Sequence, residues 1–248
     1  MDLVSVIIPY YRKRNFVKET LISVINQNYE NLEVLVIYDD TNLNDFEFLK
    51  KISKIDNRIK IIKNLERLGS GFSRNVGIEN ANGKYVAFLD ADDTWSPDKL
   101  ESQISFMKKN DYKLTHTSYY VMNEKKKIIG QRKARDLLSI NDILKSCDIG
   151  LSTVIIEKNV IAHNKIKFPK LKTKEDFVFW LMLFKKNYKF YALDKYLTNW
   201  LDLKNSLSSS TIQKLKDGFK VYNVHMNFNI FKSVYYLLCL SLNYLKKR

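Results

Sequence analysis

Four short apolar runs dominate the first ninety residues of this 248-residue chain. They cover residues 4–8, 32–37, 59–62 and 85–89, a length typical of buried strands. Segments with the helical spacing of apolar residues separate them. Strands that are apolar on both faces and alternate with helices form parallel sheets that helices cover on both sides. The sequence therefore predicts an α/β fold with a mostly parallel central sheet flanked by helices.

The remaining segments give a coarse map of the other elements. Asn15 and Ser96 are N-cap types of residue ahead of helical spacing, so we expect each to begin a helix. The pattern is looser beyond residue 110, where a basic connection at 124–135 separates two strands. We expect helices at residues 15–27, 44–55, 72–80, 97–109, 173–186 and 217–248, strands at 113–121 and 154–156, and a serine-rich loop at 206–211.

Charge is spread unevenly along the chain. Residues 1–95 hold 13 Lys and Arg against 14 Asp and Glu, whereas residues 96–248 hold 29 against 13. A basic half of this kind suits a membrane surface, a nucleic acid or an anionic substrate, or it is simply a lysine-rich solvated surface. The two cysteines suggest no disulfide framework, and we expect neither a signal peptide nor a membrane-spanning helix.

Polar residues follow three of the four apolar runs. The segments PYY (9–11), DD (39–40) and DADD (90–93) each stand where a predicted strand ends. A single Asp in such a place is commonly a turn or helix-start residue. Ligands of open α/β sheets, however, bind beyond the carboxyl ends of the strands, so three such segments together predict a binding site at this edge.

The DADD segment carries chemistry of its own. Carboxylates this close repel one another, and the cost rises where water is scarce. Mg²⁺ and Mn²⁺ prefer carboxylate, water and phosphate oxygens, and one or two carboxylates can hold such an ion while a nucleotide diphosphate completes its shell. We expect Asp92 to bind Mn²⁺ or Mg²⁺ with Asp90 beside it. Asp93 is either a second ligand or the lead into the next helix.

Two further segments have both a structural and a functional interpretation. The glycine-rich segment LGSGFSRN (68–75) opens a predicted helix, either as a plain joint or as a place where Arg74 and backbone N–H groups meet a phosphate. Thr173 and Asp176 have the spacing of a capping box, but a carboxylate at a helix start can also serve as a base. The sequence shows no zinc-site spacing, Walker loop or Gly-x-Ser-x-Gly segment.

Together these segments resemble the family 2 glycosyltransferases, inverting enzymes with the GT-A fold. VSVIIPYY (4–11) is similar to the opening strand of that family, and LEVLVIYDDTNLND (32–45) to its second strand and acidic turn. ERLGSGFSRNVGIENANGKYVAFLDADDTWSPDKL (66–100) matches its central block, and KEDFVFWLMLF is similar to its Glu-Asp motif. The resemblance is close over about residues 3–110 and loose over 150–210.

The resemblance implies a role for each candidate residue. Asp92 would hold Mn²⁺ or Mg²⁺ beside a departing diphosphate. Asp176 would take the proton of the acceptor hydroxyl, which attacks the anomeric carbon from the face opposite the diphosphate. The residues implied to line the nucleotide-sugar are Pro9, Tyr11, Asp39, Asn64, Arg74 and Asp90.

Some positions depart from the pattern of that family. Tyr38 stands where the first Asp of the acidic pair is usual. Leu201 and Leu203 stand where an Arg and a His often precede the serine-rich loop, so a phosphate or metal contact is lost unless Lys204 or the basic tail supplies it. These leucines favour an alternative in which the chain is an inactive relative that serves as a binding or scaffold module. A third alternative, a nucleic-acid-binding protein, would give the aspartates no role.

The same reasoning predicts the domain organisation and the partners. Residues 1–212 would be a GT-A catalytic domain, with a nucleotide-binding half at 1–110 and an acceptor half at 111–212, and residues 213–248 a basic amphipathic helical tail. The tail would lie in a membrane interface, pair with a second copy in a homodimer, or fold on its own core. The resemblance implies transfer of a single sugar, with a UDP-sugar favoured as donor, to a glycan or lipid-linked acceptor of polysaccharide or lipopolysaccharide biosynthesis. The enzyme would be cytoplasmic or peripheral at the inner face of the cell membrane.

Overall fold

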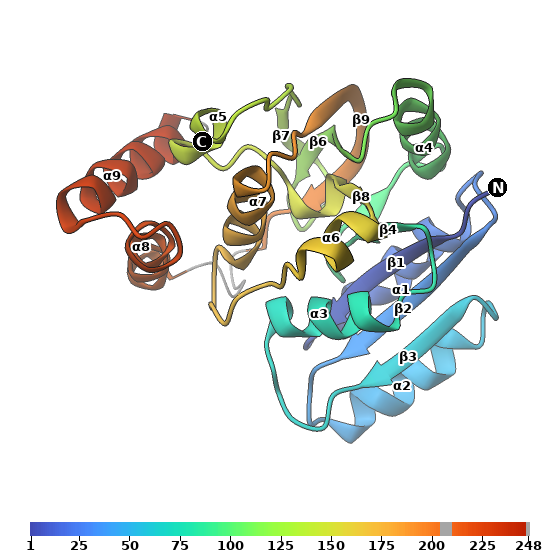
Figure 1. Ribbon diagram of the computed structural model, residues 1–248. Helices are drawn as coiled ribbons and strands as arrows, with labels where there is room; N and C mark the ends of the chain where they lie inside the picture. Colours follow the sequence, from blue (N-terminus) through green and yellow to red (C-terminus); the bar gives the residue numbers. More distant parts are fainter. Residues whose placement is uncertain (204–209, 247–248) are drawn as a thin grey trace.

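The computed structural model describes residues 1–203 and 210–246, so Lys204 and most of the expected serine-rich loop lie outside the described residues. A mixed sheet forms the centre of the molecule (Figure 1). Its strands follow the order β3-β2-β1-β4-β8-β6-β9-β5, and β7 pairs with β6. The strands are β1 (Val4–Tyr10), β2 (Leu32–Tyr38), β3 (Ile59–Lys63), β4 (Tyr85–Phe88), β5 (Thr94–Trp95), β6 (Leu114–Met122), β7 (Ile128–Arg132), β8 (Ile155–Glu157) and β9 (Tyr191–Leu201).

The strand pairing is parallel in one part of the sheet and mixed in the other. β1 pairs in parallel with β2 and β4, and β2 pairs in parallel with β3, as the alternation of strands and helices predicts. β8 then joins β4 and β6 in antiparallel fashion, and β9 runs parallel to β6. The α/β fold class, with a central sheet flanked by helices, is confirmed, and parallel pairing dominates only in the first half.

Helices cover both faces of the sheet. They are α1 (Arg14–Ile25), α2 (Leu43–Ser53), α3 (Ser70–Asn80), α4 (Lys99–Asn110), α5 (Ile140–Leu144), α6 (Lys158–Asn164) and α7 (Glu175–Lys185). On β1, Ile7 points into a core that buried residues of α3, α6 and α7 share. Val6 and Ile8 point into a second core with α1, α2 and α4. This division explains why the first strands are apolar at nearly every position.

Two predicted helix starts are wrong, and the local bonding explains both. α1 begins at Arg14 with Lys13 as its N-cap, so Asn15 lies inside the first turn. α4 begins at Lys99, because β5 and the turn that follows it occupy residues 94–98. Ser96 donates its backbone N–H to Leu197 and accepts from the N–H of Lys99, so it forms a turn ahead of the helix instead of capping it.

The sequence pattern also misses three strands, of which β5 has only two residues. β7 lies inside the basic connection predicted at 124–135. β9 contains Asp194, Lys195, Thr198 and Asn199, which hide its apolar positions from a pattern search. Pairing with β6 along one edge and with β5 along the other holds β9 in the sheet. Its end reaches the edge where the aspartates stand.

The C-terminal segment forms two helices where we expected one. α8 (Thr211–Lys220) continues into a π-helical turn, η2 (Val221–His225), before α9 (Ile230–Lys246) begins. A Cβ atom on Gly218 would stand 2.7 Å from Cδ1 of Leu237, so this glycine lets α8 pack closely on α9. No helix in the described part of the chain is both long and apolar enough to cross a membrane.

Candidate active site

A cavity opens at the carboxyl ends of β1, β2 and β4, where the sequence predicts a binding site. The start of α7 and the end of β9 form its other walls. Asn64 does not reach the cavity, because it is buried behind Asp39. The other seven predicted residues line it: Pro9, Tyr11, Asp39, Arg74, Asp90, Asp92 and Asp176.

Asp39 holds the glycine-rich loop in place. Its Oδ1 accepts hydrogen bonds from the backbone N–H of Leu68 at 2.7 Å and from Nδ2 of Asn64 at 2.8 Å. Its Oδ2 accepts from the N–H of Gly69 at 2.7 Å. Gly69 has φ of 87°, a left-handed conformation that favours glycine. The sequence suggested that backbone N–H groups of this loop could meet a phosphate, but those of Leu68 and Gly69 are bound to Asp39 instead.

An aromatic ring and a cation form the wall of the cavity beside Asp39. The guanidinium carbon of Arg67 lies 4.0 Å from the centroid of the Tyr11 ring, a cation–π distance. Both residues line the cavity, and Arg67 directly precedes the loop that Asp39 holds. A flat face of this kind suits stacking by a planar ring. Arg67 could not be predicted as a site residue, because nothing in its spacing distinguishes it from a surface arginine.

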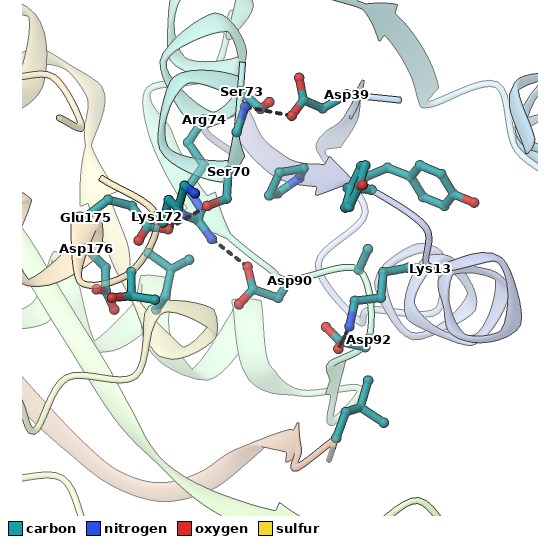
Figure 2. A pocket seen from close by; sticks show the side chains of 18 of the residues that line it. Lys13, Asp39, Ser70, Ser73, Arg74, Asp90, Asp92, Lys172, Glu175 and Asp176 are labelled. Atoms are coloured by element: carbon teal, nitrogen blue, oxygen red, sulfur yellow. Dashed lines mark hydrogen bonds and ion pairs between the residues drawn. The ribbon is translucent and has the colours of Figure 1, made fainter. Parts of the chain in front are cut away.

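Arg74 links the two halves of the site. Its Nη1 donates to Oε1 of Glu175 at 2.7 Å, and its Nη2 donates to Oδ1 of Asp90 at 2.8 Å (Figure 2). Ser70 also donates to Oε1 of Glu175, at 2.7 Å. Burial alone would lower the pKa of Arg74, but the two carboxylates outweigh it and raise that pKa. The guanidinium is thus a fixed positive charge between α3, α7 and the aspartate turn.

The two outer-facing aspartates of the DADD turn have different partners. Asp90 pairs with Arg74, whereas Oδ2 of Asp92 accepts from Nζ of Lys13 at 2.5 Å. Figure 2 shows the Asp90 and Asp92 carboxylates near the same part of the cavity. Burial raises the pKa of Asp92, and Lys13 opposes that rise. Lys13 was not a predicted site residue, since the basic run RKR before α1 looks like a solvated surface.

Asp93 is neither a ligand facing the cavity nor a helix start. Its Oδ2 accepts from the Ser152 hydroxyl at 2.5 Å, and its Oδ1 accepts from the backbone N–H of Leu201 at 2.9 Å. The Ser152 hydroxyl also accepts from the N–H of Asp90 at 3.1 Å. Burial, with repulsion from Asp92 and Asp90, raises the pKa of Asp93 well above its usual value. Ser152, in the 3-10 helix η1 (Leu151–Thr153), therefore fastens both ends of the turn.

The donor set fits a hard divalent cation. The described residues hold no group of three or more His, Cys, Asp or Glu side chains that could cage a metal ion. Mg²⁺ and Mn²⁺ need no such cage where one or two carboxylates and the phosphates of a substrate complete the shell. Asp92, with Asp90 beside it, supplies these carboxylates. A cation there would also relieve the repulsion within the turn.

Asp176 stands at the start of α7, on the wall opposite the aspartate turn. Its Oδ1 accepts from the backbone N–H of Phe177 at 2.7 Å. Burial, then the neighbouring Glu175 carboxylate, raises the pKa of Asp176 to about 6. The predicted capping box is wrong: Lys174 is the N-cap, and Thr173 donates its N–H and hydroxyl to Asp217. A carboxylate that titrates near neutral pH suits a general base.

Two of the residues that depart from the family pattern, Leu201 and Leu203, reach the cavity, whereas Tyr38 does not line it. Trp200, Leu201 and Leu203, at and just beyond the end of β9, line its wall. Trp200 is half exposed there, which gives the site a second aromatic face. These residues make this wall apolar where the pattern usually has charged residues.

Proteins that are named as glycosyltransferases are similar to nearly the whole chain. The family model described as "Glycosyl transferase family 2" matches residues 5–188. The candidate teichuronic acid biosynthesis glycosyltransferase TuaG of Bacillus subtilis (strain 168) is 32% identical over 99% of this chain and 97% of its own. The UDP-Glc:alpha-D-GlcNAc-diphosphoundecaprenol beta-1,3-glucosyltransferase WfgD of Escherichia coli is 34% identical over 95% of this chain and 91% of its own.

Solved structures share the fold at lower identity. Residues 1–349 of TarS of S. aureus, solved with UDP-GlcNAc, superpose with a TM-score of 0.75 at 22% identity, over 96% of this chain and 70% of that chain. The mannosyltransferase PcManGT of Pyrobaculum calidifontis, solved with GDP-Man and Mn²⁺, gives 0.68 at 14% identity, over 94% and 69%. The fold, the family model and the relatives agree: the chain is a glycosyltransferase that belongs to glycosyl transferase family 2 and has the GT-A fold.

Proposed function

We propose that the protein transfers one hexosyl group from a UDP-sugar to a glycan or lipid-linked acceptor, with inversion at the anomeric carbon. The observation that supports this most is the placement of Asp176 and Asp92 on one cavity. Figure 2 shows Asp90 between them, held by Arg74. A base on one wall and a cation-binding carboxylate on the other are the two groups that a single displacement needs.

The proposed reaction is one displacement. Asp176 takes the proton of the acceptor hydroxyl, and the oxygen attacks the anomeric carbon from the face opposite the diphosphate. The bond from the anomeric carbon to the diphosphate oxygen breaks, and its electron pair leaves with UDP. A bound Mn²⁺ or Mg²⁺ would neutralise the charge that develops on the diphosphate. Arg74 keeps Glu175 and Asp90 in place, so that the neighbouring base and the aspartate turn face each other across the cavity.

The donor end is proposed to lie beside β1 and β2. Tyr11 and Arg67 offer the flat wall for a base, with Pro9 next to them, and Asp39 and Asn64 fix the loop that shapes this end. Residues 1–110 would then be the donor half and residues 111–212 the acceptor half. UDP is favoured because WfgD is named for UDP-Glc and TarS was solved with UDP-GlcNAc.

The acceptor is proposed to be carried on a lipid, as the name of WfgD states for that enzyme. The product would enter a cell-surface polysaccharide such as a lipopolysaccharide, and TuaG is named for the related teichuronic acid pathway. An enzyme with such an acceptor would work in the cytoplasm, peripherally at the inner face of the membrane. The tail at 213–248 would make that contact, and a homodimer is the other arrangement that it could support.

A donor screen tests the proposal. The purified protein is incubated with Mn²⁺, a short-chain lipid diphosphate glycan and each of a panel of nucleotide-sugars, and release of nucleoside diphosphate is measured. We expect one UDP-sugar to give acceptor-dependent release that Asp176→Asn and Asp92→Asn both abolish. Turnover that survives both substitutions would overturn the assigned roles. Failure of every nucleotide to bind in calorimetry with Mn²⁺ would favour the inactive scaffold instead.

A further inference from the structure

The exposed side of α9 is apolar, the reverse of an ordinary surface helix. Phe231 is 87% exposed and Leu238 is 58% exposed, although both belong to a helix that lies on the outside of the fold. The helix packs inward with its other side, where Ser233 and Leu240 are buried. The exposed residues form what we call the C-terminal apolar face: Ile230, Phe231, Val234, Tyr235, Leu238, Leu242 and Leu245.

The members of this face lie along one side of the helix. Phe231, Tyr235, Leu238, Leu242 and Leu245 are spaced by four, three, four and three residues, which places them in one row. The row extends for about 20 Å at 1.5 Å per residue. Figure 1 shows α8 and α9 at the end of the molecule away from β1 to β3. A contiguous apolar row of this length differs from the single exposed apolar residues that are normal on a protein surface.

Lysines border the C-terminal apolar face, and α8 and α9 carry no exposed acid among their described residues. Lys232 lies on the same helix, and Nζ of Lys145 is 5.9 Å from the ring centroid of Tyr235. Lys216 and Lys220 are exposed on α8. Within the described residues 210–245 the sequence has one acidic side chain, Asp217, which is 1% exposed and bound to Thr173 and Gln213. An apolar row between lysines is complementary to anionic lipid headgroups above acyl chains.

We propose that the C-terminal apolar face lies in the interface of an anionic membrane, with its lysines on the headgroups. The proposal rests on the lipid-linked acceptor of the proposed function, and it names the surface that meets the lipid. α9 would lie in the plane of the membrane, where an amphipathic helix buries only its apolar side. A second copy of the chain is a poorer occupant, because a self-pairing of this surface brings the lysines of α8 and α9 together, and neither helix has an exposed acid among its described residues to offset them.

A buried hydrogen-bond pair joins this surface to the catalytic loop. Oδ2 of Asp217 on α8 accepts from both the N–H and the hydroxyl of Thr173 at 3.0 Å. Thr173 lies three residues before Asp176 and lines the cavity itself. The C-terminal apolar face and Asp176 are therefore connected through this pair. Docking of the face on a membrane would fix the distance of the acceptor hydroxyl from Asp176.

Vesicle co-sedimentation tests the docking. The full chain is mixed with vesicles of phosphatidylglycerol and phosphatidylethanolamine, or of phosphatidylcholine alone, and the bound fraction is measured against lipid concentration. We expect binding to the anionic vesicles that weakens with salt. Phe231→Ser with Leu238→Ser should lower it about thirtyfold or more, since each side chain buries apolar area in the interface. Ile129→Ser, at another exposed apolar position on β7, should leave it unchanged.

A charge test separates the headgroup contribution. Lys216→Glu with Lys232→Glu should reduce binding to anionic vesicles about tenfold or more, whereas Lys125→Glu in the exposed connection before β7 should change it little. Equal binding by the wild type and the Phe231→Ser, Leu238→Ser variant would overturn the proposal. So would a dimer in light scattering that this variant dissociates, together with no binding to vesicles, because a second copy would then cover the face.

Failure of the proposed function looks different from failure of the docking. UDP binding with Mn²⁺ and turnover of a water-soluble acceptor should be the same in the docking variants as in the wild type. Only transfer to acceptor embedded in vesicles should fall. A protein that binds no nucleotide but still binds anionic vesicles would refute the proposed function and leave the docking surface standing.

Discussion

Ser152→Ala is the most informative single substitution, because one hydroxyl fastens both ends of the aspartate turn. The change removes the 2.5 Å bond to the buried Asp93 carboxylate and the 3.1 Å bond from the N–H of Asp90. A buried donor or acceptor that loses its partner costs about 1–3 kcal/mol, and two bonds are removed here, so we expect a loss of about 3 kcal/mol in the free energy of unfolding. At about 2–4 °C per kcal/mol for a chain of this size, Tm should fall by about 6–12 °C.

Urea unfolding and Mn²⁺ binding measure the two consequences of Ser152→Ala separately. Because the turn that carries Asp92 is loosened, Mn²⁺ affinity in the presence of UDP should fall by about tenfold, monitored by electron paramagnetic resonance. Ser241→Ala is the matched control, since that hydroxyl bonds only to a helix carbonyl in α9, at Leu237. A Ser152→Ala protein that loses less than about 1 kcal/mol and binds Mn²⁺ like the wild type would refute this account of the turn.

Three further predictions follow from other contacts. With a pKa of about 6, Asp176 is about 9% deprotonated at pH 5 and about 91% at pH 7, so kcat/KM should rise about tenfold over that range. Asp176→Asn should lower kcat by about 10²–10⁴ and remove this rise. A pH profile of kcat/KM that is flat from pH 5 to 7 would count against Asp176 as the base. Lys13→Ala removes the ammonium that competes for Asp92, so Mn²⁺ without nucleotide should bind about tenfold more tightly, and weaker binding would show that Lys13 supports the ion instead. Gly77→Ala places a Cβ 2.4 Å from Cγ2 of buried Ile7, so it should cost about 1–3 kcal/mol in urea unfolding, and an unchanged midpoint would contradict the close approach of α3 to β1.

The sequence predicted the parallel half of the fold well and the mixed half poorly, for a physical reason. A strand buried on both faces, such as β2, is apolar at almost every position and stands out. β9 lies among polar residues, and its place depends on pairing with β6 and β5, which are far away in the sequence. The helix starts failed for a similar reason: Thr173 bonds to Asp217, 44 residues later, and does not cap α7.

The candidate site shows the same division between local and distant information. Asp90, Asp92 and Asp176 could be predicted because carboxylates at strand and helix ends are unusual enough to notice. Their partners could not, because Lys13 reaches Asp92 across 79 residues and Ser152 reaches Asp93 across 59. Side chains of this kind are recognised only when the fold brings them together. The predicted roles of the site residues stay predictions until the substitutions are measured.

The Arg74 bridge limits how the two halves of this enzyme can be exchanged between relatives. One guanidinium takes a carboxylate from each half, Asp90 from the first and Glu175 from the second. A hybrid that received residues 111–212 from another enzyme would acquire the residues at positions 175 and 176 together. If that other enzyme lacked an acid at the position of Glu175, the buried guanidinium of Arg74 would keep only the Asp90 carboxylate as a partner. The loss of one buried partner would destabilise the hybrid. Recombination is therefore expected to succeed only between enzymes that share this three-residue bridge.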